Sequence, residues 1–255
     1  MLLFIALPLV ALFTYASLSE LWASLNQRQV IEAIRLSLVT SLSTTLVTVI
    51  FGTPVAYLLA QRRSRFNRLV DSLIDMPLLL PPSVAGIALL MAFGRNGLVG
   101  AWLASAGINI PFTTLAVIMA QTFIASPFYI KAAAIGFAGV SAELKQAAAL
   151  DGAGRWQTFS HIIIPLSWMA LLSGCVMTWA RAMGEFGATI IFAGNFPGRT
   201  QTMPLAIYIG FEIDLNVALT LSIIMIGFSF ITLILVKGIL HRRMEANLEL
   251  TTTLS

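Results

Sequence analysis

The chain has 255 residues, of which 58% are hydrophobic and only 10% are charged, and its mean hydropathy is +0.90. A soluble domain of this length could not bury so much apolar surface, so the composition predicts an integral membrane protein. The formal net charge of +4 does not indicate nucleic-acid binding, because the basic residues lie in short segments between apolar runs. The single cysteine, Cys175, excludes a disulfide within the chain.

About six apolar runs are long enough to cross a bilayer as helices, since a spanning helix needs roughly 20 residues. They predict an all-α fold with spans near residues 2–19, 36–60, 69–93, 113–137, 166–193 and 215–238. The first run resembles a signal peptide, but no basic residues follow Met1 and no convincing cleavage site precedes Glu20. We therefore expect a retained helix and one transmembrane domain over residues 1–255, with its core at residues 36–238.

The lysines and arginines between the runs predict the orientation of the chain. If both termini are cytoplasmic, ten of these residues face the cytoplasm, four face outside, and Arg181 lies within the membrane. Cytoplasmic loops carry the excess of Lys and Arg, so this multi-pass topology is favoured. The ten are Arg62, Arg63, Arg65, Arg68, Lys131, Lys145, Arg155, Lys237, Arg242 and Arg243, and the four are Arg28, Arg35, Arg95 and Arg199.

Prolines interrupt two of the runs, at residues 76–82 and 125–127. Proline removes a backbone hydrogen bond and clashes with the preceding turn, so both helices are expected to bend or break. Broken membrane helices are tolerated where they line a cavity, which favours a translocation path made by the third, fourth and fifth runs. Asp71 and Asp75 are expected at the headgroup level at the start of the third run, and Lys131 is expected to extend its ammonium to the cytoplasmic surface.

Polar side chains within the runs identify a candidate path. Ser37, Ser41, Thr44 or Thr45, and Thr48 follow one face of the second run, which favours close helix packing; the alternative is a hydroxyl-lined path for a hydrated solute. Arg181 and Glu185 are four residues apart in the fifth run. They are expected to share one helix face as an ion pair; alternatively, Arg181 gives a positive potential to an anion pathway.

Residues 141–165 form a polar segment that the topology places in the cytoplasm. Ser141 is a suitable N-cap, and Glu143 falls in the first turn, where a negative charge suits the helix dipole. An apolar stripe at helical spacing follows, made by Leu144, Ala147 and Ala148. Gly152 and Gly154 can end this helix and Pro165 can open the next. Because the segment presents a helix to the cytoplasm, it is expected to dock onto a soluble partner.

The chain shows no pattern of enzyme chemistry. It has no glycine loop followed by Lys-Ser/Thr, so ATP cannot bind in that way, and no nucleophile-elbow motif. His161 and His241 are isolated and lack the spacing of metal ligands, so no metal site is expected.

The polar segment resembles the EAA loop of ABC importer permeases. Gln146-Ala147-Ala148 is followed after three residues by Gly152, and nine residues later by Ile162-x-Ile164-Pro165. Two positions depart from the family pattern, since Gln146 replaces a glutamate and Ile164 a leucine, so any salt bridge of that glutamate is missing here. The resemblance implies a type I ABC importer permease fold with a coupling loop at residues 138–165. Its coupling helix would dock onto a cytoplasmic ATP-binding subunit through Glu143, Gln146, Ala147, Ala148, Asp151, Gly152 and Pro165.

The second half resembles the molybdate branch of these permeases, through the sequence from Arg181 to Thr189 and the run Thr200-Gln201-Thr202-Met203-Pro204-Leu205-Ala206-Ile207-Tyr208. This implies a homodimeric molybdate or tungstate permease in a prokaryotic cell membrane, with Ser41, Thr44, Arg181 and Glu185 as candidate path residues. The implied partners are two ATP-binding subunits, which use the ATP, and an extracytoplasmic oxyanion-binding protein; no cofactor is expected on this chain.

Two alternatives stay open. Sulfate permeases share Arg-Ala-x-Gly-Glu-Phe-Gly with residues 181–187, so a sulfate or thiosulfate permease differs only in cargo. An ion-driven secondary transporter would show inverted repeats and ion-coupling carboxylates near the middle of the membrane. Glu185 is the only deep carboxylate and no repeat is evident, which favours the ABC permease.

Overall fold

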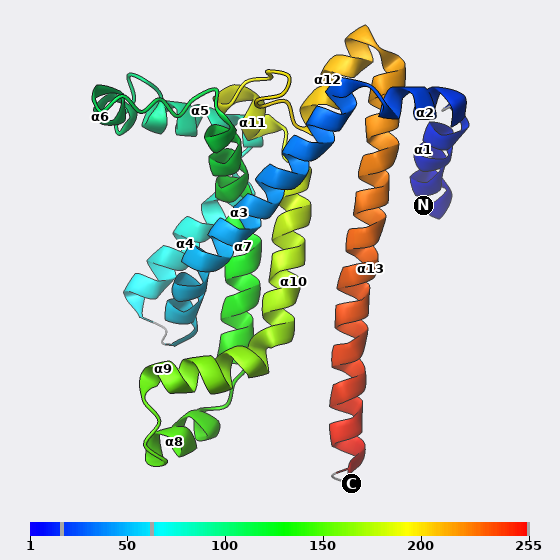
Figure 1. The fold of residues 1–255 in the computed structure, drawn as a ribbon. Coiled ribbons are helices and arrows are strands. Elements are labelled where there is room, and N and C mark those ends of the chain that lie inside the picture. The colour runs from blue at the N-terminus through cyan, green and yellow to red at the C-terminus, as the bar shows by residue number, and fades with distance from the viewer. Residues whose placement is uncertain (16–17, 62–63, 254–255) are drawn as a thin grey trace. The chain divides into compact units, whose positions relative to one another are not determined.

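The structure is a computed structural model that describes residues 1–15, 18–61 and 64–253 (Figure 1). Side chains are described up to residue 238, except those of residues 2, 5, 15, 18 and 20. The described residues form helices joined by loops, without a strand, which confirms the all-α prediction. Four of the ten basic residues that predicted the orientation lie outside the described part. They are Arg62 and Arg63, and the side chains of Arg242 and Arg243. The elements are α1 (Leu2–Tyr15), α2 (Leu18–Leu25), α3 (Arg28–Gln61), α4 (Arg65–Leu79), α5 (Pro82–Phe93), α6 (Gly100–Ser105), α7 (Thr114–Ala138), α8 (Ala142–Leu150), α9 (Arg155–Thr158), the π-helical turn η1 (Phe159–Ile163), α10 (Ile164–Met183), α11 (Gly187–Phe192), α12 (Met203–Ile213) and α13 (Leu215–Thr253).

Within the described residues, four helical segments are long and apolar enough to cross a membrane: Arg28–Gln61, Thr114–Ala138, Arg155–Met183 and Leu215–Gly238. A fifth is counted if α4 and α5, which are separated by a sharp break after Leu79, form one broken span. The sequence predicted about six. The difference is the first run, where α1 has 14 residues and so extends about 21 Å at 1.5 Å per residue, short of the hydrocarbon thickness.

The predicted break in the third run is confirmed. Leu80 has ψ 136°, the extended conformation that is favoured before a proline, and Pro81 and Pro82 then begin α5. The predicted interruption at residues 125–127 differs, because α7 continues through Pro127 as one helix. The hydroxyl of Thr178 in α10 donates to the carbonyl of Ala125 (3.3 Å), which ties α10 to α7 beside the proline.

The chain packs as two compact units, each assembled from three stretches of sequence. The first unit contains Met1–Ser43, Pro81–Gln121 and Met183–Ile231. Its helices α5 and α11 pack closely, since a Cβ on Gly86 would lie 2.8 Å from the Ala188 carbonyl oxygen and 2.8 Å from Ile191 Cβ. Glycine is required there because a larger residue would separate the two backbones.

The second unit contains Thr44–Leu80, Thr122–Ala182 and Thr232–Ser255. Its core brings together side chains of α3, α7 and η1: Ala56, Tyr129, Ile130, Ala133, Phe137, Val140 and Ile163. Helices α7 and α10 pack through small residues, because a Cβ on Gly136 would lie 2.6 Å from Ala170 Cβ. In this unit α8 and α9 follow the end of α7 and lead into α10 (Figure 1).

Candidate coupling site and buried polar segments

Helix α8 has a cap at each end, as its sequence predicts. The Ser141 hydroxyl accepts from the backbone N–H of Leu144 (3.4 Å), and Glu143 lies in the first turn. At the other end Gly152 has φ +85°, its N–H donates to the Ala149 carbonyl (3.2 Å), and the N–H of Ala153 donates to the Ala148 carbonyl (2.9 Å). These two bonds form a Schellman motif, so the end of α8 is fixed by local geometry.

Helix α8 is also tied to α7. The Lys145 ammonium donates to the carbonyl of Phe137 in the last turn of α7 (3.4 Å), where a cation suits the helix dipole. Ala148 is 8% exposed and lies against the chain itself. This differs from the predicted role of Ala148 in close contact with a partner. The other candidate contacts of this helix and its cap are exposed: Glu143, Gln146, Ala147, Asp151 and Gly152.

The segment after α8 starts a second helix earlier than the sequence predicts. Gly154, expected at the end of α8, is instead the N-cap of α9, where its N–H donates to Gln157 Oε1 (2.7 Å). Helix α9 continues through η1 into α10, so Pro165 is the second residue of α10 inside a longer helical run. The wider π-helical turn lies directly before Pro165, where the proline ring would clash with the preceding turn of a regular helix.

Helices α8 and α9 and the loop between them form the α8–α9 hairpin, residues 142–158. Two large apolar side chains on this hairpin were not selected from the sequence. Leu150 at the end of α8 is 89% exposed, and Trp156 in α9 is 74% exposed. A leucine and a tryptophan in a polar segment, away from the apolar runs, were the signal that could have identified them. With Leu144 half-exposed on α8, they give the hairpin an apolar surface suited to a protein partner.

The hydroxyl residues of α3 are buried within the chain. Ser37, Ser41 and Thr44 are 0% exposed, and Thr48 is 2% exposed. In the first unit the Ser37 hydroxyl accepts from the N–H of Met203 at the start of α12 (2.7 Å), and Ser41 donates to the Leu38 carbonyl (3.3 Å). These contacts favour the packing interpretation of the stripe, while a role of Ser41 and Thr44 along the path stays a prediction.

Arg181 and Glu185 do not share a helix face. Helix α10 ends at Met183, so Arg181 lies in its last turn and Glu185 lies in the following loop. The Glu185 carboxylate is 1% exposed, and its Oε1 accepts from the N–H of Ala188 in the first turn of α11 (2.8 Å). The prediction of one helix over residues 166–193 is therefore wrong, since the Gly-Glu-Phe-Gly sequence ends one helix and caps the next.

Replacement of Glu185 by alanine is expected to destabilise the protein by about 1–2 kcal/mol, because the buried N–H of Ala188 loses its acceptor. Glu185→Gln keeps the oxygen at that position and is expected to lose less. The midpoint of thermal unfolding in detergent measures both variants. Equal losses of stability in Glu185→Ala and Glu185→Gln would mean that the charge of Glu185, rather than this hydrogen bond, stabilises the loop between α10 and α11.

The Thr-Gln-Thr segment before α12 is interior. Thr200, Gln201 and Thr202 are at most 3% exposed. The Thr200 hydroxyl accepts from the N–H of Phe196 (2.9 Å), and Gln29 Nε2 donates to Gln201 Oε1 (3.4 Å). This segment therefore fixes the loop before α12 against α3 in the first unit. No group of three or more His, Cys, Asp or Glu side chains that could hold a metal ion occurs among the described residues.

Comparison with known proteins identifies the family. Residues 52–248 match the family described as "Binding-protein-dependent transport system inner membrane component". The chain belongs to this family. This membership confirms the prediction of an ABC importer permease, which is a transport subunit and not an enzyme.

Several relatives of this permease are known. The "Probable transport system permease protein NifC" of Clostridium pasteurianum is 39% identical over 90% of this chain and 81% of that protein. The "Molybdenum transport system permease protein ModB" of Mycobacterium tuberculosis is 40% identical over 88% of this chain and 84% of that protein. The "Sulfate transport system permease protein CysT" of Escherichia coli is 30% identical over 94% of this chain and 88% of that protein.

A solved structure confirms the fold. A chain of the bacterial alginate ABC transporter in complex with an alginate-bound periplasmic protein aligns with a TM-score of 0.70 at 17% identity, over 94% of this permease and 88% of that chain. The protein therefore has the type I ABC importer permease fold. As such a permease it is a multi-pass protein of the inner membrane that works with ATPase and substrate-binding partners.

Proposed function

We propose that this chain is the permease of a molybdate importer and that tungstate, an oxyanion of nearly the same shape, is accepted as well. The higher identity to the molybdenum permease than to the sulfate permease supports this cargo. The buried Thr200-Gln201-Thr202 segment, which carries the resemblance to the molybdate branch, supports it further. Sulfate or thiosulfate is the second candidate, because the sulfate permease aligns over nearly the whole chain.

The proposed assembly has two copies of this chain, two ATP-binding subunits and an extracytoplasmic oxyanion-binding protein. ATP is bound and hydrolysed by the partner subunits, and no cofactor is held by this chain. Both termini are proposed to be cytoplasmic, which the excess of Lys and Arg on that side supports. Arg181 would favour an anion in the path, and Ser41 and Thr44 would flank it.

The coupling step is proposed to act through the α8–α9 hairpin. The observation that carries this coupling step is the hairpin's geometry: α8 has nine residues, is capped at both ends and is tied to α7 by Lys145, and Leu150 and Trp156 are exposed. A rigid helix with an apolar surface is suited to receive a displacement from a docked ATPase and to pass it to α7 and α10. The motif residues Gln146, Ala147, Asp151 and Gly152 would lie in or beside that contact.

ATP-dependent uptake of labelled molybdate tests this proposal. Proteoliposomes contain this permease, its ATPase and its binding protein, with excess unlabelled tungstate or sulfate added as competitor. Tungstate is expected to block uptake and sulfate is not. Blocking by sulfate would assign the chain to the sulfate branch, and uptake that persists without the ATPase but requires an ion gradient would contradict an ABC importer.

The source of selectivity needs a further arm, because the binding protein also chooses the anion. The same assay with the binding protein of a sulfate importer, mixed with this permease, separates the two contributions. Loss of all uptake in this arm agrees with a permease that is matched to its own binding protein. Efficient sulfate uptake would show that the permease itself accepts both oxyanions.

A further inference from the structure

An ion cluster joins α4 to α7 in the second unit. Lys131 of α7 donates from Nζ to Asp71 Oδ1 (2.5 Å) and to Asp75 Oδ2 (2.9 Å) of α4. The two aspartates are four residues apart, so they lie on one face of α4 with the ammonium between them. The sequence placed Lys131 toward the surface and the aspartates at the headgroup level, and did not predict that they pair; the side chains remain partly exposed, 31% for Lys131, 48% for Asp71 and 41% for Asp75.

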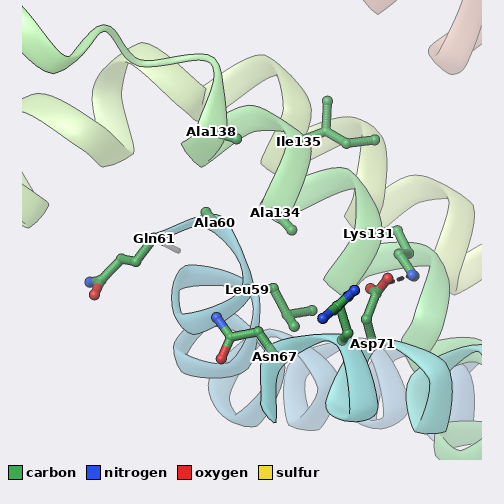
Figure 2. A pocket seen from close by; sticks show the side chains of 10 residues that line it. Leu59, Ala60, Gln61, Asn67, Asp71, Lys131, Ala134, Ile135 and Ala138 are labelled. Carbon is green, nitrogen blue, oxygen red and sulfur yellow. Dashed lines mark hydrogen bonds and ion pairs between the residues drawn. The ribbon is translucent and has the colours of Figure 1, made fainter. Parts of the chain in front are cut away.

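The cluster lies at the edge of a cavity of about 670 Å³ between the end of α3, α4 and α7. Figure 2 shows Lys131 and Asp71 pointing toward each other from the two helices beside this cavity. On the α3 side, Asn67 Nδ2 donates to the Leu58 carbonyl (2.9 Å). Polar contacts therefore hold α4 at two points around a space that side chains do not fill.

Apolar packing between α4 and α7 is present but does not define their register. Ile74 of α4 packs against the core cluster that contains Ile130 and Ala133 of α7. Such contacts are non-directional, so neighbouring arrangements of the two helices differ little in energy. The ion cluster is directional. Breaking it would leave the Lys131 ammonium, which is 31% exposed, without its two carboxylate partners, so the cluster favours one position of α4 along α7.

The same part of α7 carries the coupling helix. Lys145 of α8 binds the carbonyl of Phe137, six residues after Lys131 on α7. Six residues of helix span about 9 Å, so the attachment of α8 and the ion cluster occupy the last two to three turns of one rigid element. A displacement of α8 thus reaches Lys131 without passing through a loop.

We propose that Lys131, with Asp71 and Asp75, is a positioning clamp that passes the displacement of the coupling helix from α7 to α4. The inference rests on the proposed function, because it assumes that α8 receives the ATPase stroke. Helix α4 ends at the break at Leu80–Pro81, and of its contacts with α7 the ion cluster is the directional one. Without the clamp, α4 follows the movement of α7 less closely.

Reconstituted transporter with Lys131→Met tests the clamp, since methionine keeps the length of the side chain and removes the charge. We expect molybdate transported per ATP hydrolysed to fall by about tenfold, which is within the usual range of a coupling interaction. ATP hydrolysis itself should fall much less, because the ATPase still docks on α8. Lys131→Arg keeps a cation with several donors and is expected to retain most of the ratio.

A triple variant, Lys131→Met with Asp71→Asn and Asp75→Asn, separates coupling from stability. It leaves no unpaired charge, so its thermal unfolding midpoint should return toward that of the wild type. The clamp predicts that its ratio of transport to hydrolysis stays low. Recovery of the ratio in the triple variant, or an unchanged ratio in Lys131→Met, would overturn the clamp.

The clamp and the proposed cargo fail in distinguishable ways. The wild type is measured before any variant. Absence of molybdate uptake in the wild type, with an active ATPase, contradicts the proposed cargo. The clamp is then judged with whichever oxyanion the wild type carries, because the ratio compares each variant with the wild type. Single changes give a graded control: Asp71→Asn and Asp75→Asn each leave Lys131 one carboxylate partner, and both are expected to lose less than Lys131→Met.

Discussion

Replacement of Gly86 by valine is expected to prevent α5 and α11 from packing. The new Cβ would lie 2.8 Å from the Ala188 carbonyl oxygen, 2.8 Å from Ile191 Cβ and 3.0 Å from Ala188 Cα. Two of these atoms belong to the backbone of α11 and cannot rotate away, so the helices must separate. We expect a loss of about 3 kcal/mol or more, at the upper end of the overpacking range. Size-exclusion profiles and the thermal unfolding midpoint in detergent measure the effect.

Gly227→Val is the matched control for this change. Gly227 lies within α13, and a Cβ there would meet no heavy atom within 4 Å. The two variants add the same side chain to a helical glycine, and only Gly86 faces a neighbouring backbone. A similar loss in both would show that the helical propensity of valine, rather than the α5–α11 contact, causes the effect.

The ends of α8 could be predicted from the sequence because they depend on neighbours along the chain. The Ser141 hydroxyl caps the helix by accepting from an N–H three residues away. Gly152 adopts a positive φ easily because it has no Cβ, whereas other residues would be strained there. The break before α5 follows from Pro81 and Pro82 in the same local way. Periodicity, caps and prolines therefore located the coupling helix and the bent pair.

Contacts between distant parts of the chain could not be predicted in this way. The break between α10 and α11 was also missed, although it is local: Gly184 and Gly187 allow α10 to end, and the Glu185 carboxylate accepts from the N–H of Ala188. Lys131 reaches Asp71 and Asp75 only because α7 packs beside α4, and their sequence separation gives no register. The signal available beforehand was that a cation and two carboxylates occur at similar depth in two spans, which makes each the natural partner of the other.

The motif marks Ala148 as a candidate contact with a partner, but the structure buries its side chain within the chain. The motif identifies Ala147 and Ala148 together as candidate contacts, because both are small residues at one place in a docking helix. In the structure Ala147 is exposed and Ala148 is buried, since adjacent residues on a helix point about 100° apart. A charge at position 148 would disturb the fold of the hairpin, so position 147 is the one at which a substitution tests the docking contact.

Gly152→Val is expected to abolish most ATP-dependent uptake while the protein still enters the membrane. The backbone at Gly152 has φ +85°, which a β-branched residue adopts only at a considerable cost, so the end of α8 must change conformation. The Schellman bonds of Gly152 and Ala153 are then lost, and α8 no longer presents Leu150 in a fixed direction. A loss of coupling of about tenfold or more in uptake at equal amounts of protein is expected, measured in proteoliposomes beside ATP hydrolysis.

Gly107→Val separates the docking role of Gly152 from the local cost of strain. Gly107 also has a positive φ (+79°), and like Gly152 it has no heavy atom within 4 Å of where a Cβ would stand. It follows α6 in the first unit, whereas Gly152 follows α8 in the second. The two valines thus impose the same kind of backbone strain, but only one of them alters the coupling helix. If both variants lose uptake equally, strain in any exposed turn is sufficient and α8 has no special role; if only Gly152→Val loses it, the orientation of α8 controls transport.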